Sequence, residues 1–337
     1  MDEYELPAEI LDRRAYTERR LSEIKGTLRT ILARHDVSLH DDVCIYATGS
    51  GGRGEMSEAS DLDAFVVFDG EIDVLKATEI QAVLIHTFRE CGLERPSRDG
   101  FFLSPHSKSG LTKQLGSPAD DHTNTLTARM LLLLESVPLD GESVHQDVVQ
   151  HALSEYWMLR DLHPGEFLPF MLTNDIIRYW RIVLLNHESH LRDKIGKVSE
   201  AALGRERKYR SYKMRFARCT TCFSALTYML SVTRNGGDMT QDQAAEMVRL
   251  APLARLERIG EAWPDCAGHV QKLLGLYGRF LERSKAGKRA FMDQLETDSF
   301  MSETVSSEST QYTEAMLALM SALRDEANAA LYRHMVI

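Results

Sequence analysis

The chain has 337 residues, of which 43% are hydrophobic and 27% charged, a globular composition with room for one large or two ordinary domains. Its formal net charge of −10 argues against a protein that coats nucleic acid with its whole surface, and its five cysteines do not suggest a disulfide scaffold. The acidic N-terminus lacks the apolar segment of a secretory signal, and the longest aliphatic run, residues 130–134, is too short to cross a bilayer. We therefore expect a cytoplasmic protein without membrane contact.

The first third of the chain alternates predicted helices and strands. Leu21, Ile24, Leu28 and Ile31 recur at helical spacing and predict a long amphipathic helix. Apolar runs bounded by glycine or aspartate predict short strands. In chain order, the patterns predict a helix, two strands, a second helix and a third strand over residues 8–34, 43–47, 61–68, 73–90 and 101–103.

From Thr123 onward the pattern is helical almost throughout. Thr240, followed by Gln243 three residues later, predicts a capping box at the start of one helix. The polar stretch 297–310 predicts a loop, and the residues after it predict a last helix at about 312–334. Cys219 and Cys222 have zinc-like spacing but lack a second ligand pair at the usual distance, so we expect core cysteines.

The expected fold class is α+β. A small mixed sheet with an N-terminal helix forms a first domain over residues 1–120, and an all-helical domain follows over residues 121–337.

Two aspartates of the second predicted strand provide the first chemical signal. Side chains two residues apart on a strand share a face, so Asp61 and Asp63 would present their carboxylates side by side. Adjacent carboxylates repel one another, and a divalent cation removes that cost. Oxygen ligands of this kind suit Mg²⁺ or Mn²⁺. We expect Asp61 and Asp63 to be metal ligands.

A glycine-rich turn provides the second signal. Gly49 and Ser50 follow the first predicted strand and open the segment Gly49-Ser50-Gly51-Gly52. Glycines let backbone N–H groups approach phosphate oxygens closely. The turn is therefore a candidate phosphate-binding site.

Together these segments resemble the signature of polymerase β-type nucleotidyltransferases. That signature is Gly-Ser, about ten residues, then Asp-hydrophobic-Asp-hydrophobic. Here Gly49-Ser50 is followed by ten residues and then by Asp61-Leu62-Asp63-Ala64. The inner Gly52-Arg53-Gly54-Glu55 resembles the subgroup that contains bacterial protein uridylyltransferases.

The resemblance implies transfer of a nucleoside monophosphate from an NTP, ATP among the candidates, to an acceptor hydroxyl, with release of pyrophosphate. It implies that Asp61 and Asp63 hold two metal ions, and that Gly49 and Ser50 grip the β- and γ-phosphates. Arg53, inside the same turn, becomes a candidate nucleotide-binding residue.

The family also uses a third carboxylate from a neighbouring strand. Asp99 stands at the start of the third predicted strand and is the candidate for this catalytic and metal-binding role. It is followed directly by Gly100, which departs from the family's pattern, and a turn aspartate before glycine is the alternative.

Two basic residues of the helical domain are candidates for nucleotide binding. Residues 192–218 contain ten Lys/Arg against three acids. Lys213, flanked by aromatic residues, would contact the triphosphate, and the alternative is a lysine on a solvated helix face. Arg178 shares a helical face with Asn174 and Arg181 and would line the nucleotide cleft. Its alternative is a structural ion pair with Asp175 or Glu188.

The acceptor stays open, because nothing resembles the thumb of a polymerase. A protein side chain, a small molecule, a second nucleotide and an RNA end are all compatible with the sequence, which does not indicate an oligomeric state. The alternative function is a nucleotide-binding regulatory or antitoxin-like protein with little or no catalysis. The intact pair Asp61 and Asp63 speaks against that alternative.

Overall fold

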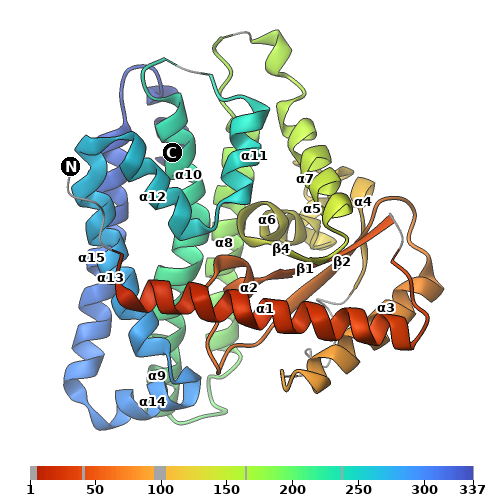
Figure 1. The fold of residues 1–337 in the computed structure, drawn as a ribbon. Helices are drawn as coiled ribbons and strands as arrows, with labels where there is room; N and C mark the ends of the chain where they lie inside the picture. Colours follow the sequence, from red (N-terminus) through yellow and green to blue (C-terminus); the bar gives the residue numbers. More distant parts are fainter. Residues whose placement is uncertain (1–5, 40–41, 95–103, 164, 237, 337) are drawn as a thin grey trace. The chain divides into compact units, whose positions relative to one another are not determined.

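The computed structural model describes the chain except residues 1–5, 40–41, 95–103, 164, 237 and 337 (Figure 1). The chain divides into two compact units. The head unit comprises Asp12–Leu159, and the helical unit comprises Met1–Leu11 with Arg160–Ile337. The domain boundary expected at residue 120 lies inside the head unit.

The head unit is built on a mixed four-stranded sheet in the order β3-β2-β1-β4. Strand β1 pairs antiparallel with both β2 and β4, and β2 pairs parallel with β3. The strands are β1 (Val43–Thr48), β2 (Asp63–Phe68), β3 (His106–Ser107) and β4 (Val137–Asp140).

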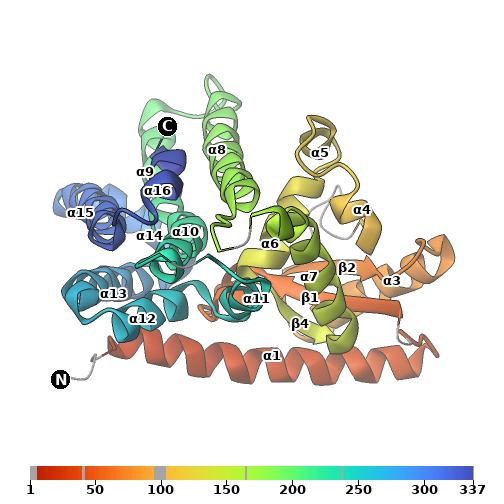
Figure 2. The ribbon, with the colours of Figure 1, turned by 90° about the horizontal axis from the view of Figure 1, so that it is seen from above.

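Helices connect and cover these strands. They are α1 (Ala8–Arg34), α2 (Gly49–Arg53), α3 (Val74–Glu90), α4 (Lys108–Thr112), α5 (Ala119–His122), α6 (Thr125–Glu135) and α7 (Glu142–Trp157). Figure 1 shows α1 running beneath the strands, and Figure 2 shows the same helix alongside them from above.

The apolar core lies between one face of the sheet and helices α1 and α3. Alternate residues of β1 and β2 point into this core, because successive strand residues face opposite sides. They meet apolar residues at helical spacing on the two helices. The main members are Val43, Ile45, Ala47, Ala64, Val66 and Phe68 from the strands, and Ile24, Leu28, Ile31, Ile80, Leu84 and Phe88 from the helices.

The other face of the sheet is also covered, since α6 and α7 both contact β1. There Tyr46 stacks on Phe65 with ring centroids 5.5 Å apart, and meets the ring of His145 edge-on at 5.6 Å. Residues 46, 48, 63 and 65 therefore belong to this second face.

The helical unit contains α8 to α16, arranged around α10. Helix α10 contacts α8, α11, α12, α15 and α16. The helices are α8 (Phe170–Arg192), α9 (Glu200–Lys213), α10 (Cys219–Thr233), α11 (Gln241–Arg249), α12 (Pro252–Ala262), α13 (Ala267–Ser284), α14 (Gly287–Thr297), α15 (Ser299–Leu323) and α16 (Ala329–Val336). A π-helical turn, Met214–Arg218, joins α9 to α10.

The structure confirms the predicted α+β fold class and several predicted elements. Helix α1 has the predicted bounds, and β1 and α3 differ from prediction by one residue at one end. The capping box is present: the Thr240 hydroxyl accepts from the Gln243 backbone N–H at 3.2 Å, and the Gln243 side-chain Oε1 accepts from the Thr240 backbone N–H at 2.8 Å. Cys219 and Cys222 are buried free cysteines of α10.

The loop predicted at 297–310 is wrong, because Thr297 ends α14 and residues 299–310 belong to α15. Asp298 caps the helix by accepting from the N–H groups of Phe300 and Met301. The hydroxyls that suggested a loop donate to carbonyl groups four residues earlier, as from Thr304 to Phe300 at 2.9 Å. The last helix predicted at 312–334 is accordingly two helices, α15 and α16.

One strand prediction and part of the helical prediction also need correction. Strand β2 begins at Asp63, two residues later than expected, so Asp61 lies in the segment before the strand. Strand β4 interrupts the region predicted as helical and pairs with β1 through Val137 and Ala47. The strand predicted at 101–103 lies outside the described residues. None of the helices in the described part of the chain combines the length and apolar composition needed to cross a bilayer.

Candidate functional site

The glycine-rich turn and one of the two aspartates meet at the end of β1. Thr48, the last residue of β1, pairs with Asp63, the first residue of β2. The next residue, Gly49, has a φ of +65°, where side chains are strained. A Cβ atom on Gly49 would stand 3.1 Å from the Asp63 Oδ2 atom. The carboxylate of Asp63 therefore lies against the α-carbon that opens the turn.

The turn itself is fixed by close packing. It forms the short helix α2, which ends at Gly54 with a φ of +72°. The N–H of Glu55 donates to the Ser50 carbonyl at 2.8 Å. A Cβ atom on Gly52 would stand 1.7 Å from the carbonyl oxygen of Glu135, so only glycine allows α2 to approach the end of α6 this closely. Ser50 is half-buried within the turn.

Arg53 is part of the scaffold of this turn. It is 7% exposed, and its guanidinium pairs with Glu55 Oε2 at 2.8 Å and with Glu135 Oε2 at 2.9 Å. Both carboxylates are buried as well. The three side chains tie the turn to α6, and a contact of Arg53 with nucleotide stays a prediction.

Asp61 is exposed and lies two residues before the strand. A tight turn leads to it: the Ser57 N–H donates to the Ser60 hydroxyl at 2.9 Å, and the Ser60 N–H donates to the Ser57 carbonyl at 3.0 Å. Leu62, between the two aspartates, is buried in the core. Asp61 and Asp63 therefore do not both belong to β2, as the spacing predicted, and a metal-binding role for Asp61 stays a prediction.

Three buried polar side chains on the same face of the sheet were not singled out from the sequence. The hydroxyls of Tyr46 and Thr48 are buried, and neither has a hydrogen-bond partner within the described residues. Burial raises the pKa of Tyr46 well above its ordinary value. His145 contacts the Ser136 hydroxyl at 2.8 Å, and burial lowers its pKa to about 4. Polar residues at alternate positions of β1 are the sequence signal that could have found two of them.

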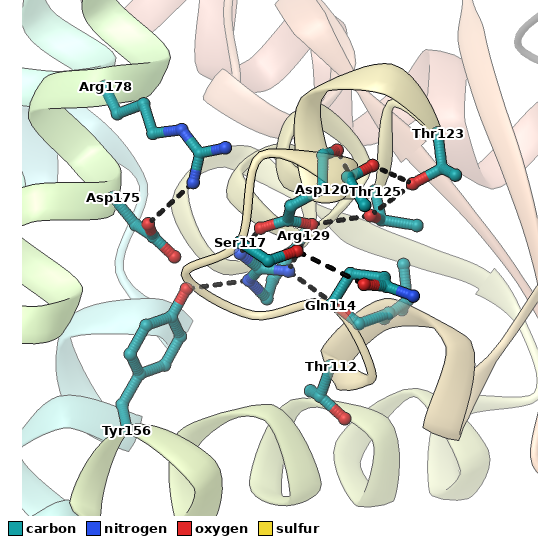
Figure 3. Close-up of polar contacts among 12 residues, drawn as sticks. Thr112, Gln114, Ser117, Asp120, Thr123, Thr125, Arg129, Tyr156, Asp175 and Arg178 are labelled. Atoms are coloured by element: carbon teal, nitrogen blue, oxygen red, sulfur yellow. Dashed lines mark hydrogen bonds and ion pairs between the residues drawn. The ribbon is translucent and has the colours of Figure 1, made fainter.

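A buried ion pair braces the helices next to this face. Arg129 of α6 and Asp120 of α5 are both fully buried, and Arg129 Nη2 lies 2.6 Å from Asp120 Oδ2. Arg129 also donates to the Tyr156 hydroxyl at 2.7 Å and to the Leu111 carbonyl at 2.6 Å (Figure 3). Thr125 donates to Asp120 Oδ1. This network joins α4, α5, α6 and α7 and serves the structure of the head unit.

The two basic candidates belong to the helical unit. Arg178 Nη1 of α8 lies 3.7 Å from Oδ1 of the buried Asp175 (Figure 3). This is the ion pair predicted as the structural alternative to nucleotide binding. Lys213, the last residue of α9, is exposed, and its Nζ lies 5.8 Å from the centre of the Tyr209 ring. Their contacts with nucleotide stay predictions.

Residues 192–218 form the basic segment, and some of its cations lie close to one buried carboxylate, that of Glu206 of α9. Lys288 Nζ lies 2.8 Å from its Oε1 atom, Lys194 Nζ 3.3 Å, His190 Nε2 3.6 Å and Arg210 Nη1 3.8 Å. Lys194 and Arg210 of residues 192–218 thus lie next to a carboxylate of the same stretch.

The residues present at the turn fit Mg²⁺ or Mn²⁺. Asp99, the expected third ligand, lies outside the described residues, and the described part of the chain contains no group of three or more acidic, histidine or cysteine side chains placed to hold a metal. Mg²⁺ commonly binds through one or two carboxylates and completes its shell with water and substrate phosphates. Asp63 beside a glycine turn, with Asp61 close by in sequence, provides that donor set.

Comparison with protein families gives one match. Residues 27–89 match the family described as "Nucleotidyltransferase domain". This segment runs from α1 to α3 and contains Gly49, Ser50, Asp61 and Asp63. No curated protein and no solved structure matches the chain. The match supports the nucleotidyltransferase superfamily and nucleotidyl transfer in general terms, and the uridylyltransferase-like subgroup stays a prediction.

Proposed function

We propose that the protein transfers a nucleoside monophosphate from an NTP to an acceptor hydroxyl and releases pyrophosphate. The observation that carries this proposal is the contact between the Gly49 turn and the Asp63 carboxylate. It puts a backbone suited to phosphate next to a carboxylate suited to a divalent cation, inside the segment that matches the nucleotidyltransferase domain.

Each residue of the proposed site has a role in this reaction. The backbone N–H groups at Gly49 and Ser50, with the Ser50 hydroxyl, bind the β- and γ-phosphates and orient the leaving group. Asp61 and Asp63 would hold Mg²⁺ or Mn²⁺, which when bound neutralises charge on the phosphates and aligns the acceptor oxygen. Asp99 is the proposed third ligand. Lys213 and Arg178 are proposed to bind the triphosphate.

The bonds exchanged define the reaction class. The acceptor oxygen forms a bond to the α-phosphorus, while the bond from that phosphorus to the oxygen bridging the α- and β-phosphates breaks. Pyrophosphate leaves with the electron pair, and the proton of the acceptor passes to solvent. The acceptor is a protein side chain, a small molecule, a second nucleotide or an RNA end.

Position-specific labelling tests this proposal. The protein is incubated with Mg²⁺, cell extract and each of the four NTPs, labelled at either the α- or the γ-phosphate. We expect one NTP to transfer α-label to a macromolecular or small product, and γ-label to appear only in pyrophosphate. Transfer of γ-label to the product would show phosphoryl transfer and contradict the proposal.

The same experiment distinguishes a transferase from the alternative, a nucleotide-binding regulatory protein. Binding of NTP without transfer of either label, in extract from several growth conditions, would support a regulatory protein. The label-bearing fraction also identifies the acceptor class, because protease, ribonuclease and filtration each remove a different class of product.

A further inference from the structure

Thr48 carries a buried hydroxyl that the proposed roles do not use. The side chain is 1% exposed, and its Oγ1 atom has no hydrogen-bond partner among the residues that the structure describes. Buried hydroxyls are costly without a partner, so an isolated one calls for a physical explanation.

The position of this hydroxyl points to Asp63. Thr48 and Asp63 are paired residues of antiparallel β1 and β2, and paired residues present their side chains on the same face. The next pair on that face, Tyr46 and Phe65, stacks ring on ring, which confirms the direction. Gly49, directly after Thr48, lies against the Asp63 carboxylate. Thr48 is thus the neighbour of the glycine turn along the chain and of the proposed metal ligand across the sheet.

We propose that Thr48 is a positioning residue, whose hydroxyl donates to the Asp63 carboxylate when that carboxylate binds a divalent cation. This inference rests on the proposed function and extends it to a residue outside the Gly-Ser and Asp-hydrophobic-Asp pattern. A carboxylate that binds a cation through one oxygen has a second oxygen free to accept a hydrogen bond. A donor on that oxygen fixes the orientation of the ligand and strengthens metal binding.

Threonine suits this task for two reasons. Its β-branched side chain has few χ1 rotamers, so the hydroxyl is held in place by the strand. Its side chain is 1% exposed, so the hydroxyl is shielded from competing water. The residue would therefore act on metal affinity without touching the substrate.

The test uses Thr48→Val, which keeps the shape and removes the hydroxyl. Binding of Mn²⁺ alone to the full-length protein is measured by electron paramagnetic resonance, and Tm is measured without metal. We expect Mn²⁺ affinity to fall about tenfold and Tm to rise by about 2–4 °C, because an unpartnered buried hydroxyl is removed. Thr48→Ser, which keeps the hydroxyl, should restore Mn²⁺ affinity to within about twofold of the wild type.

Tyr46→Phe is the matched control. It removes the other partnerless hydroxyl of the same strand and face, two residues from Thr48. We expect Tm to rise as for Thr48→Val and Mn²⁺ affinity to stay at the wild-type value. A rise in stability coupled to weaker metal binding would then be specific to Thr48.

The outcomes separate this inference from the function on which it rests. If the wild type binds Mn²⁺ and transfers α-label, but Thr48→Val binds Mn²⁺ equally well, the role of Thr48 is wrong and the function stands. A lower Tm for Thr48→Val would also overturn it, since the hydroxyl would then be a structural hydrogen-bonding group. If the wild type neither binds Mn²⁺ nor transfers label, both proposals fail.

Discussion

The α-carbon of Gly49 and the carboxylate of Asp63 lie so close that a Cβ atom at residue 49 would stand 3.1 Å from Asp63 Oδ2. This contact joins the glycine turn to the first residue of β2. It fixes two parts of the proposed site that are fourteen residues apart in the sequence.

The contact predicts a specific effect of Gly49→Ala. The left-handed φ makes alanine unfavourable by about 1–2 kcal/mol, and the added methyl group also pushes against the Asp63 carboxylate. Gly54→Ala is the matched control, because Gly54 has a φ of +72° and the nearest atom to its Cβ would be Arg14 Cγ at 3.9 Å. In urea unfolding both variants should lose similar stability. Only Gly49→Ala should weaken Mn²⁺ binding, and equal Mn²⁺ affinities would contradict the proposed arrangement.

The buried position of Arg53 predicts a large loss of stability for Arg53→Met. The change removes a cation that pairs with two buried carboxylates, Glu55 and Glu135, and the expected cost is about 3–5 kcal/mol in the free energy of unfolding. Arg34→Met removes the exposed pair with Glu90 in the same unit and should cost less than about 1 kcal/mol. Urea titrations of both variants check the difference. Similar midpoints would argue that Arg53 is not a structural anchor.

His145 predicts a dependence of stability on pH. Burial lowers its pKa in the folded protein from 6.5 to about 4. Between these values the unfolded chain binds a proton that the folded protein does not, so stability falls as the pH is lowered from about 6.5 towards 4. The contribution is fully present above pH 6.5, and its slope approaches about 1.4 kcal/mol per pH unit.

The non-titrating variant His145→Gln checks this contribution. Its free energy of unfolding should depend less steeply on pH over the same range than that of the wild type. Part of the slope should remain, because burial also lowers the pKa of His106. Identical pH profiles for the two proteins would show that His145 does not contribute.

The proposed role of Lys213 predicts that two lysine-to-alanine changes, each removing one charge, affect nucleotide affinity differently according to their position. If it contacts a phosphate, Lys213→Ala should cost about 1.5–3 kcal/mol, or roughly ten- to a hundredfold in the Kd for NTP. Lys197→Ala removes another exposed lysine of residues 192–218 and should have almost no effect. Titration calorimetry with the preferred NTP compares them, and small equal effects would assign the basic segment to the surface.

The sequence predicted the head unit well where apolar periodicity was strong. Helices α1 and α3 and strand β1 have long or continuous apolar patterns, and they lie where predicted. Strand β4 has four residues, one of them Pro138, so it carries no alternation to detect. Helix α15 begins with serines and threonines that favour loops on average. Met301, Val305 and Tyr312 recur at helical spacing and are buried, and this tertiary packing stabilises the helix.

The sequence identified residues of the candidate site, but it did not predict how they are arranged in space. The spacing identified Gly49, Ser50, Asp61 and Asp63, but the contact of Gly49 with Asp63 depends on strand register, which the sequence alone does not fix. The pairing of Arg53 with Glu135 joins positions 82 residues apart and leaves no local pattern. The polar character of Thr48 can be seen in the sequence, but the burial of its hydroxyl without a partner among the described residues can be seen only in the structure.

Release of pyrophosphate as a function of Mg²⁺ concentration tests the central claim most directly. The account predicts that the wild type releases pyrophosphate in a Mg²⁺-dependent manner from one preferred NTP in cell extract. Asp61→Asn and Asp63→Asn should each release it at least about a hundredfold more slowly. Asp69→Asn is the control, because Asp69 follows the other end of β2 and pairs with Lys108, and it should keep the wild-type rate. Wild-type rates for both Asp61→Asn and Asp63→Asn would contradict the account.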